Sequence, residues 1–304
     1  MSTHRIPFLA SAFALSAGVV WSFGAVTARK ADQTDAFQYL IWRSIGIIIV
    51  IEVIARLKRR PPVTPVAFRS GRMMMLANLM LLLASIAFVY ALKTTTAANA
   101  AFLASMTPLI AVVGSRTFLG ERMSRITIVA LGFALAGLVI TVWGDLEAGN
   151  MTGNISAVMS SVGFAGYTVC LRTDPHRDWS PVMPGYAVMM IGICTVVTLG
   201  GGHTLVPPAA DIGYALVHGG LFIVVGTLLY NVAARQVPAV AMVVFAQTET
   251  IFVPVWAVLF LSETPRATTL IGGGVIFAAV IGKAIVDSTA AHAHEPRAVA
   301  AAPG

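Results

Sequence analysis

The chain alternates between long apolar segments and short polar loops. Ten apolar segments are spaced along its 304 residues, at about 7–28, 36–57, 73–92, 95–118, 125–144, 152–171, 181–200, 212–233, 238–261 and 267–287. Each approaches the length of about 20 apolar residues that a helix needs to cross the hydrocarbon core of a bilayer. The loops between them leave no room for a soluble domain. The pattern therefore predicts an all-α polytopic membrane protein with ten transmembrane helices.

Two stretches of this pattern, 91–132 and 233–274, match each other without a gap at a shift of 142 residues. The shift pairs the polar residues that flank the apolar runs, namely Lys93 with Arg235 and Glu121 with Glu263. A basic residue before each run and Leu-x-Glu after it are hard to obtain twice by chance. The match indicates an internal duplication.

The duplication divides the chain into two repeats of five spans and a tail. The expected units are residues 1–144, residues 145–287 and a disordered cytoplasmic tail over 288–304. Because five is an odd number, the second repeat enters the membrane upside down relative to the first. Inverted repeats place a substrate site near the bilayer midplane, between the halves, and permit alternating access from either face. The expected architecture is that of a carrier.

The basic residues orient the predicted spans. If the N-terminus is cytoplasmic, fifteen Lys and Arg residues lie on the inner side and four on the outer side. Six of the inner ones fall in one loop, residues 56–72. Cytoplasmic loops carry such an excess of Lys and Arg. We therefore expect an integral protein of the bacterial cytoplasmic (inner) membrane, with both termini in the cytoplasm.

Composition supports a membrane protein and argues against a nucleic-acid partner. The chain is 57% hydrophobic and 11% charged, whereas about a quarter of the residues in soluble domains are charged. Its net charge is +7, but the basic residues lie where the positive-inside bias puts them. Cys170 and Cys194 both fall inside predicted spans, so no disulfide framework is indicated.

The first repeat has a basic residue, a span rich in small residues with a proline near its middle, and a Leu-Gly-Glu ending: Lys93, Pro108 and Leu119-Gly120-Glu121. The second repeat is similar, with Arg235, Leu261 and Glu263. Both units resemble the EamA-type repeat of the drug/metabolite transporter superfamily. The resemblance implies ten helices around a central cavity and the export or exchange of small metabolites. The overall appearance is similar to the YddG-type amino-acid exporter branch.

The second repeat departs from the family pattern at two positions. Thr250 stands where the repeat usually has its proline, with Pro254 one turn later, and Ser262 replaces the glycine before Glu263. A proline inside a helix leaves the carbonyl four residues earlier without its N–H partner. We therefore expect Pro108 and Pro254 to act as helix hinges.

Glu249 lies at the middle of the predicted ninth span. A charge at the bilayer centre costs about 2.5–3.5 kcal/mol on insertion scales, so the side chain should face protein or a water-filled cavity. Glu249 is a candidate for proton or cation coupling, or for binding a substrate ammonium group. The structural alternative is a protonated carboxyl group hydrogen-bonded to a neighbouring helix.

Helical spacing places aromatic, Met and polar side chains on shared faces of several spans. The predicted cavity residues are Trp21, Asn78, Ser85, Asn99, Phe102, Met106, Tyr167, His218, Phe245 and Glu249. Such a lining suits apolar or aromatic amino acids. Ordinary helix packing is the alternative, since aromatic rings fill gaps and polar side chains bond across helices.

Two other ionisable residues lie within spans. His218 by itself fits a hydrogen-bonded core histidine better, although imidazole titrates in a range that suits a proton relay and makes it a second coupling candidate. Arg43 is able to bind a substrate carboxylate. It is equally able to bond a helix C-terminus or to extend toward the outer face, and we favour these structural roles.

Small residues predict packing faces. Gly274, Ala278 and Gly282 recur every four residues on the tenth span and allow close backbone approach. This stripe packs inside the monomer or forms a dimer, and we favour the former. A monomer is therefore expected rather than a dimer.

No motif for a cofactor, a metal or an enzyme accompanies these residues. Gly282-Lys283 is followed by Ala284, which does not fit a phosphate-binding loop, and no His/Cys cluster has metal-ligand spacing. We predict no cofactor, with a small-molecule substrate and membrane lipid as the partners.

Other functional classes remain as alternatives. A membrane-embedded enzyme acting on lipid needs a constellation of His, Asp, Glu or Ser at one interface, and only isolated ionisable groups are present. A channel needs a polar stripe through the bilayer, whereas the polar groups cluster near its middle. A multidrug exporter of another substrate class is a further alternative.

Glu249→Gln is expected to impair transport while leaving expression intact, because the amide keeps the shape of the side chain but not its charge or its titratable proton. Solute flux in proteoliposomes at equal protein content measures the effect. Wild-type rates in the variant would remove Glu249 from the mechanism.

Overall fold

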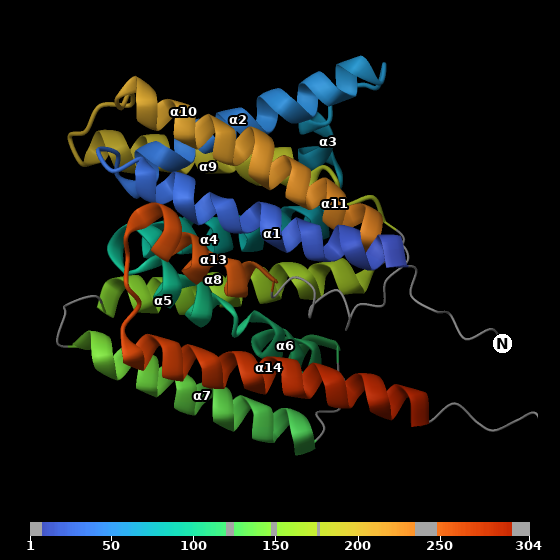
Figure 1. The fold of residues 1–304 in the computed structure, drawn as a ribbon. Helices are drawn as coiled ribbons and strands as arrows, with labels where there is room; N and C mark the ends of the chain where they lie inside the picture. The colour runs from blue at the N-terminus through green and yellow to red at the C-terminus, as the bar shows by residue number, and fades with distance from the viewer. Residues whose placement is uncertain (1–7, 120–124, 147–150, 175–176, 235–247, 294–304) are drawn as a thin grey trace, which may run out of the picture.

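The chain folds into helices joined by short loops in a computed structural model that describes residues 8–119, 125–146, 151–174, 177–234 and 248–293 (Figure 1). The helices before residue 147 are α1 (Phe8–Lys30), α2 (Ala36–Leu57), α3 (Thr64–Arg69), α4 (Arg72–Thr94), α5 (Ala97–Ala104), α6 (Thr107–Leu119) and α7 (Arg125–Leu146). Those after residue 150 are α8 (Met151–Thr173), α9 (Val182–Gly200), α10 (Ala209–Val217), the π-helical segment η1 (His218–Ile223), α11 (Val224–Ala234), α13 (Thr248–Leu261) and α14 (Ala267–Ala293).

Several of these helices are long and apolar enough to cross a membrane. In the described part of the chain, five reach at least 18 residues: Ala12–Lys30, Arg72–Thr94, Met151–Leu171, Val182–Gly200 and Ala209–Tyr230. Shorter apolar helices cover Ala97–Ala111, Ile128–Thr141, Thr248–Leu261 and Ala267–Gly282. The all-helical membrane fold class is consistent with this arrangement. The count of ten spans and the inverted repeat stay predictions.

The boundaries differ from the predicted ones in the basic loop and in the C-terminal tail. The basic loop contains the short helix α3, which begins next to Pro65, a residue suited to a first helical turn. α14 continues to Ala293, so residues 288–293 of the expected disordered tail are helical. This stretch is rich in alanine, the residue that most favours a helix. The first part of the predicted ninth span, up to residue 247, lies outside the described residues.

Helices from the two halves of the chain pack against each other throughout the bundle. α4 packs along α8, α2 along α9 and α7 along α14, while α1 contacts α11 and α13. Figure 1 shows α7 and α14 as a pair at the far side of the bundle from α2 and α10. Two pairs of elements from the two halves also end at a common offset: α1 and α8 end 143 residues apart, and so do α2 and α9.

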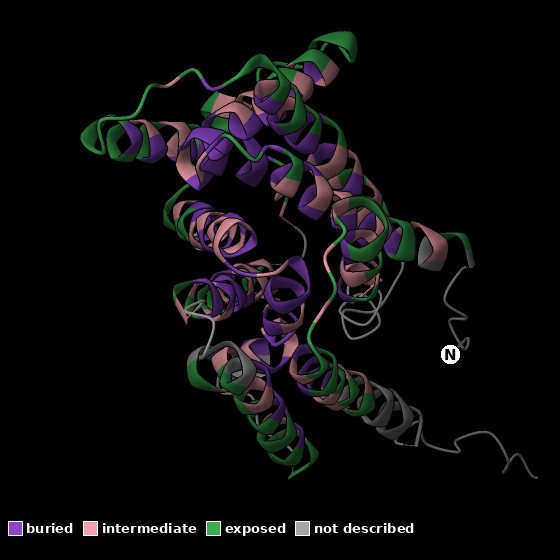
Figure 2. Cartoon of the chain, turned by 60° about the vertical axis from the view of Figure 1, so that its left-hand side comes forward, coloured by how far each residue is buried: buried purple, intermediate pink, exposed green. Residues whose placement is uncertain are grey.

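Burial follows the expected pattern for helices in hydrocarbon. In Figure 2, buried residues lie on helix faces that turn toward one another, and exposed residues lie on the outer faces. The outer faces carry large apolar side chains; Trp143 on α7, for example, is 70% exposed. Apolar surface on this scale is rare on soluble monomers and suits contact with lipid.

The small-residue stripe on α14 does not pack inside the monomer. Gly274, Ala278 and Gly282 are exposed, so the expectation of internal packing is wrong. α14 meets α7 through a neighbouring face instead, where a Cβ added to Gly137 would lie 2.5 Å from the Gly272 carbonyl oxygen. This glycine pair allows the closer backbone approach, and it turns the predicted stripe outward.

Two glycines bring α2 into backbone contact with the end of α10 and the start of η1. A Cβ on Gly46 would lie 2.7 Å from the Leu216 carbonyl oxygen, and a Cβ on Gly219 would overlap the Arg43 carbonyl group. Because these neighbours are backbone atoms, they cannot move aside as the end of a flexible side chain can. The contact sets the position of the eighth span against the second.

Gly219→Ala is expected to lower the melting temperature of the detergent-solubilised protein by several degrees, since forcing an extra carbon into a packed site costs about 1–3 kcal/mol. Gly213→Ala on α10 is the matched control. A Cβ there has nothing within 4 Å, and alanine in a helix is favoured over glycine by about 1 kcal/mol. A Gly219→Ala variant as stable as the control would contradict the close approach.

Candidate functional site

Arg43 is a buried cation inside the helix bundle. It is 3% exposed. Its Nη2 donates a hydrogen bond to Ser85 Oγ on α4, and its Nε has no hydrogen-bond partner. Within the described residues the ion pair joins Arg29 to Glu263, and no carboxylate pairs with Arg43. A buried guanidinium without a counter-ion is costly, so this arrangement favours an anionic group beside it.

The structural roles expected for Arg43 are therefore wrong. A side chain that extended toward the outer face would be exposed, and one that bonded a helix C-terminus would donate to backbone carbonyls. The hydrogen bond to Ser85 keeps the guanidinium in the interior instead. The backbone of Arg43 is in close contact with Gly219 of η1.

His218 begins η1 and lies between α1 and α2. Its Nδ1 is hydrogen-bonded to the Tyr39 hydroxyl at 2.8 Å. The imidazole rests on the backbone of α1 at Gly24, where a Cβ would overlap Nε2. The ring is thus held on both sides, as expected for a hydrogen-bonded interior histidine.

These residues form one group, which we call the Arg43 cluster: Tyr39, Arg43, Ser85 and His218. Tyr39 and Arg43 are four residues apart on α2 and share a face. Ser85 lies near the middle of α4, whereas Tyr39 lies in the first turn of α2. α2 and α4 come from the first half of the chain and η1 from the second. The cluster therefore joins helices from the two halves.

η1 was not predicted from the sequence. π-helical turns are rare and occur frequently at functional sites. The available signal was the pair Gly219-Gly220 inside an apolar run, because two adjacent glycines weaken α-helical geometry. The irregular turn presents His218 to Tyr39.

The fourth span is broken into two helices. α5 ends at Ala104 and α6 begins at Thr107. Pro108 has no N–H for the Ala104 carbonyl, and two hydroxyl groups replace it: Thr107 Oγ1 donates at 2.8 Å and Ser161 Oγ of α8 at 3.1 Å. In hydrocarbon such freed carbonyls must be satisfied by protein. The break thus lies at the predicted hinge proline.

Pro254 behaves differently. α13 runs from Thr248 to Leu261 with Pro254 inside it and no interruption. Just beyond this helix, Ser262 has φ 54°, a left-handed conformation that favours glycine. The glycine usual at this position in the family is therefore explained, because glycine adopts the left-handed conformation without steric cost.

Trp21 and Asn78, two of the predicted cavity residues, lie at helix contacts. Trp21 on α1 faces α11, with its ring centroid 5.4 Å from that of Tyr230. Asn78 is buried on α4 against Gly185 of α9, and neither of its amide atoms has a hydrogen-bond partner.

The three predicted residues of the fourth span separate. Asn99 Nδ2 donates to Thr95 Oγ1 at 3.4 Å, near the start of α5. Phe102 packs on Gly273 of α14, and Met106 is buried at the break between α5 and α6.

The remaining predicted residues lie on the sixth and ninth spans. Tyr167 on α8 has its ring centroid 5.8 Å from that of Phe164. Glu249 is half-buried in the first turn of α13. Phe245 lies outside the described residues. Of the predicted set, Ser85 and His218 belong to the Arg43 cluster, while Trp21, Asn78 and Phe102 contact other helices.

An ion pair ties the two halves together at one end of the spans. Arg29 Nε, at the end of α1, donates to Glu263 Oε1 at 2.6 Å, and Glu263 Oε2 accepts from the Ala97 N–H at 3.0 Å. A carboxylate just before a span is suited to the N-terminus of the helix that follows. Glu263 caps α5 instead, because the turn after α13 brings the carboxylate to the first turn of that helix. Glu121, its counterpart in the first repeat, lies outside the described residues.

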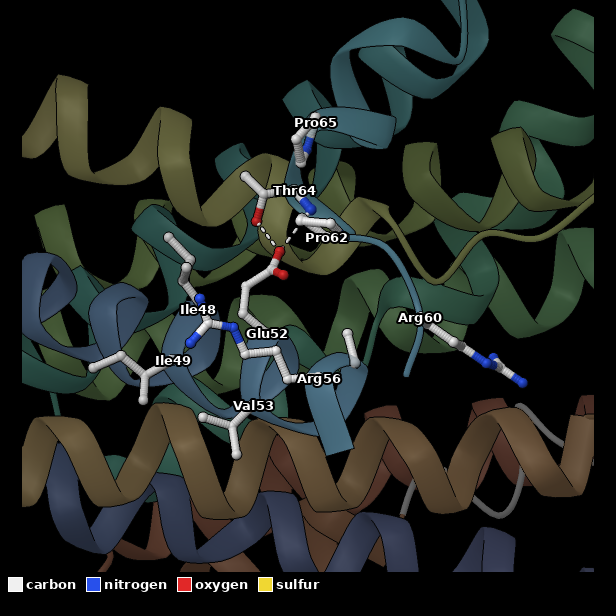
Figure 3. Close-up of a pocket in the computed structure, with 10 residues that line it drawn as sticks. Ile48, Ile49, Glu52, Val53, Arg56, Arg60, Pro62, Thr64 and Pro65 are labelled. Atoms are coloured by element: carbon white, nitrogen blue, oxygen red, sulfur yellow. Dashed lines mark hydrogen bonds between the residues drawn. The ribbon is translucent and has the colours of Figure 1, made fainter. Parts of the chain in front are cut away.

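Two hollows open on the outer surface of the bundle. One lies where α2 ends (Figure 3) and the other lies between α7 and α8. Neither is lined by any of the ten predicted cavity residues.

Comparison with known proteins gives a family match over both halves of the chain. The model of the EamA-like transporter family matches residues 8–143 and 151–283. The pseudopaline exporter CntI of Pseudomonas aeruginosa, in two strains, is 25% identical over 209 residues, which cover 69% of this chain and 73% of that protein. A solved crystal structure of a protein has a TM-score of 0.64 and 17% identity, covering 93% of this chain and 98% of that one. At this identity the likeness shows the fold alone.

Arg29→Gln and Glu263→Gln are each expected to lower the melting temperature. The melting temperature of the double variant is expected to be no lower than that of the less stable single variant, because either change breaks the same contact. The two side chains are 30% and 15% exposed, so a coupling of about 1 kcal/mol at most is expected. Lys30→Gln, at an exposed neighbour, is the control. Additive effects in the double variant would show that the pair contributes no coupling.

Proposed function

The chain belongs to the EamA-like transporter family of the drug/metabolite transporter superfamily, and from this premise we propose that it exports amino acids and similar small metabolites by alternating access. The observation that carries the proposal is the family match over two consecutive units, 8–143 and 151–283. A pseudopaline exporter among similar proteins supports export as the direction. The solute is small enough to fit between two helical halves.

Alternating access is supported by the arrangement of the halves. The ends of α1 and α8, and of α2 and α9, lie 143 residues apart, and α2 packs along α9 as α7 packs along α14. Two inverted five-helix repeats explain these pairings, since equivalent helices meet across a two-fold axis. The break in the fourth span and the π-helical turn in the eighth supply irregular backbone at mid-depth, as carriers use around their substrates. The transport path then lies within one chain, and the proposed unit is a monomer.

A substrate carboxylate is the anion that we propose for Arg43. The guanidinium is buried, keeps its Nε without a partner, and forms no ion pair within the described residues. Guanidinium groups bind carboxylates through two parallel hydrogen bonds. Amino acids carry this group, and the apolar and aromatic side chains around the bundle interior suit amino acids with large apolar side chains.

Glu249 and His218 are the proposed coupling residues. Glu249 lies half-buried in the first turn of α13, in the apolar environment of a span. His218 belongs to the second half of the chain and touches α1 and α2 of the first half, so a change in its protonation acts at a contact between the halves. Intramembrane ionisable groups of this kind commonly belong to proton relays.

We also propose that the protein lies in a bacterial inner membrane with both termini in the cytoplasm. The start of α1 and the end of α14 lie at the same end of the bundle in Figure 1, as an even number of crossings requires. The basic end of α2 lies at this end as well, which fits the positive-inside bias.

Counterflow in proteoliposomes tests the function. Vesicles loaded with unlabelled leucine or phenylalanine are expected to accumulate the labelled amino acid transiently, because a carrier exchanges solute through a saturable site. A channel gives unsaturable leak without counterflow, and a lipid-modifying enzyme gives altered lipid without solute flux. Either result would overturn the proposal. Repeating the assay with and without a pH gradient shows whether protons are coupled.

Arg43→Gln is expected to reduce counterflow of amino acids at least about tenfold, the effect of losing roughly 1.4 kcal/mol of binding. Arg43→Lys keeps the charge but not the two parallel hydrogen bonds and should retain part of the activity. Arg125→Gln, at an exposed position on α7, is the matched control. The amides of the same amino acids, which lack the carboxylate, should be poor substrates of the wild type. Equal counterflow of acids and amides would remove the proposed role of Arg43 and leave transport itself intact.

A further inference from the structure

The hollow at the end of α2 has an apolar wall and a basic rim. It encloses about 640 Å³. Ile48, Ile49 and Val53 form its wall along α2, while Arg56 and Arg60 lie where the helix gives way to the loop (Figure 3). We call this site the α2 hollow.

Glu52 holds the opposite side of the α2 hollow in place. Its carboxylate accepts hydrogen bonds from the Val63 N–H at 3.0 Å, the Thr64 N–H at 2.8 Å and the Thr64 hydroxyl at 2.6 Å. These bonds fasten the loop and the start of α3 to α2, as Figure 3 shows for Thr64. The same donors offset the negative charge of Glu52. The hollow is therefore built by defined contacts, and its acidic group is already occupied.

The two basic residues of the rim remain available to bind an anion. Arg56 and Arg60 are exposed, and the ion pair found in the described part of the chain lies elsewhere, between Arg29 and Glu263. In Figure 3 the side chain of Arg60 extends away from Glu52. With Glu52 satisfied by the loop, the rim favours an anion.

The α2 hollow lies where hydrocarbon meets the headgroup region. Ile49, Val53 and Leu57 are exposed along α2, and Leu57 is 79% exposed. Apolar side chains exposed to this extent on a spanning helix face lipid tails. Lys58 and the arginines that follow mark the start of the polar zone, where basic residues near a membrane attract anionic lipids.

We propose that the α2 hollow binds an anionic phospholipid from the leaflet at this end of the bundle. The phosphate binds the Arg56 guanidinium, which lies beside Ile48 in Figure 3, while Arg60 adds positive charge at the other side of the rim and an acyl chain runs along Ile49 and Val53. Both parts of the ligand are needed to match the site, because the wall is apolar and only the rim is charged. The bound lipid fastens the end of α2 and the α3 loop to the membrane.

Lipid titration of the purified full chain in a neutral detergent tests the proposal. Phosphatidylglycerol is expected to raise the melting temperature by several degrees and to give discrete bound-lipid peaks in native mass spectra. Phosphatidylcholine, with the same acyl chains, should do neither. Inorganic phosphate should also have no effect, and an equal shift with phosphate alone would overturn the lipid assignment.

Arg56→Gln/Arg60→Gln is expected to weaken phosphatidylglycerol binding about tenfold or more, since each basic residue near the surface contributes to the attraction. Arg69→Gln/Arg72→Gln removes the same charge from the same loop, away from the hollow, and serves as the matched control. Equal weakening in the two double variants would show diffuse attraction to the loop and overturn the site.

Val53→Trp tests the apolar wall without changing any charge. The indole ring fills part of the hollow and should weaken binding of the lipid while the melting temperature without lipid stays near that of the wild type. Unchanged lipid binding in this variant would show that the hollow is not used, and the proposal would fail.

Discussion

The bilayer supplies no hydrogen-bonding partner, and this constraint governs the interior of the protein. Every irregularity in a span must be compensated by other parts of the chain. The break after Ala104 shows the principle: Thr107 and Ser161 donate to the carbonyl that Pro108 leaves free. The guanidinium of Arg43 shows its converse, because Ser85 compensates it only in part. A buried group that the protein leaves incompletely satisfied is the natural place for a ligand.

Close backbone contact decides which polar groups meet. Gly46 and Gly219 let η1 approach α2 until the backbones of the two elements are in direct contact. That approach brings His218 to Tyr39, one turn from Arg43, and joins elements from the two halves of the chain. Small residues at helix interfaces thus do more than improve packing. They bring residues far apart in sequence into one buried polar cluster.

Charges outside the hydrocarbon have a different role at each end of the bundle. At one end, Arg29 and Glu263 join α1, the turn after α13 and the start of α5. At the other end, Glu52 fastens the loop to α2 and leaves Arg56 and Arg60 available at the surface. The contact between Arg29 and Glu263 connects the two halves of the chain, while the contacts of Glu52 leave Arg56 and Arg60 facing the membrane.

The sequence by itself determined where the long apolar helices lie, because the thickness of the bilayer sets how long an apolar run must be. The described helices other than α3 fall on the predicted segments. A proline's missing N–H did not by itself decide where a helix breaks: the fourth span is interrupted beside Pro108, whereas α13 continues through Pro254.

Only the tertiary structure decided which way each face turns. Arg43 proved to be interior, Glu263 capped α5 rather than α14, and the stripe containing Gly274 faced outward. Helical spacing shows which residues share a face. Lipid and protein interior are both apolar, however, so hydrophobicity alone does not indicate whether that face meets the membrane or another helix.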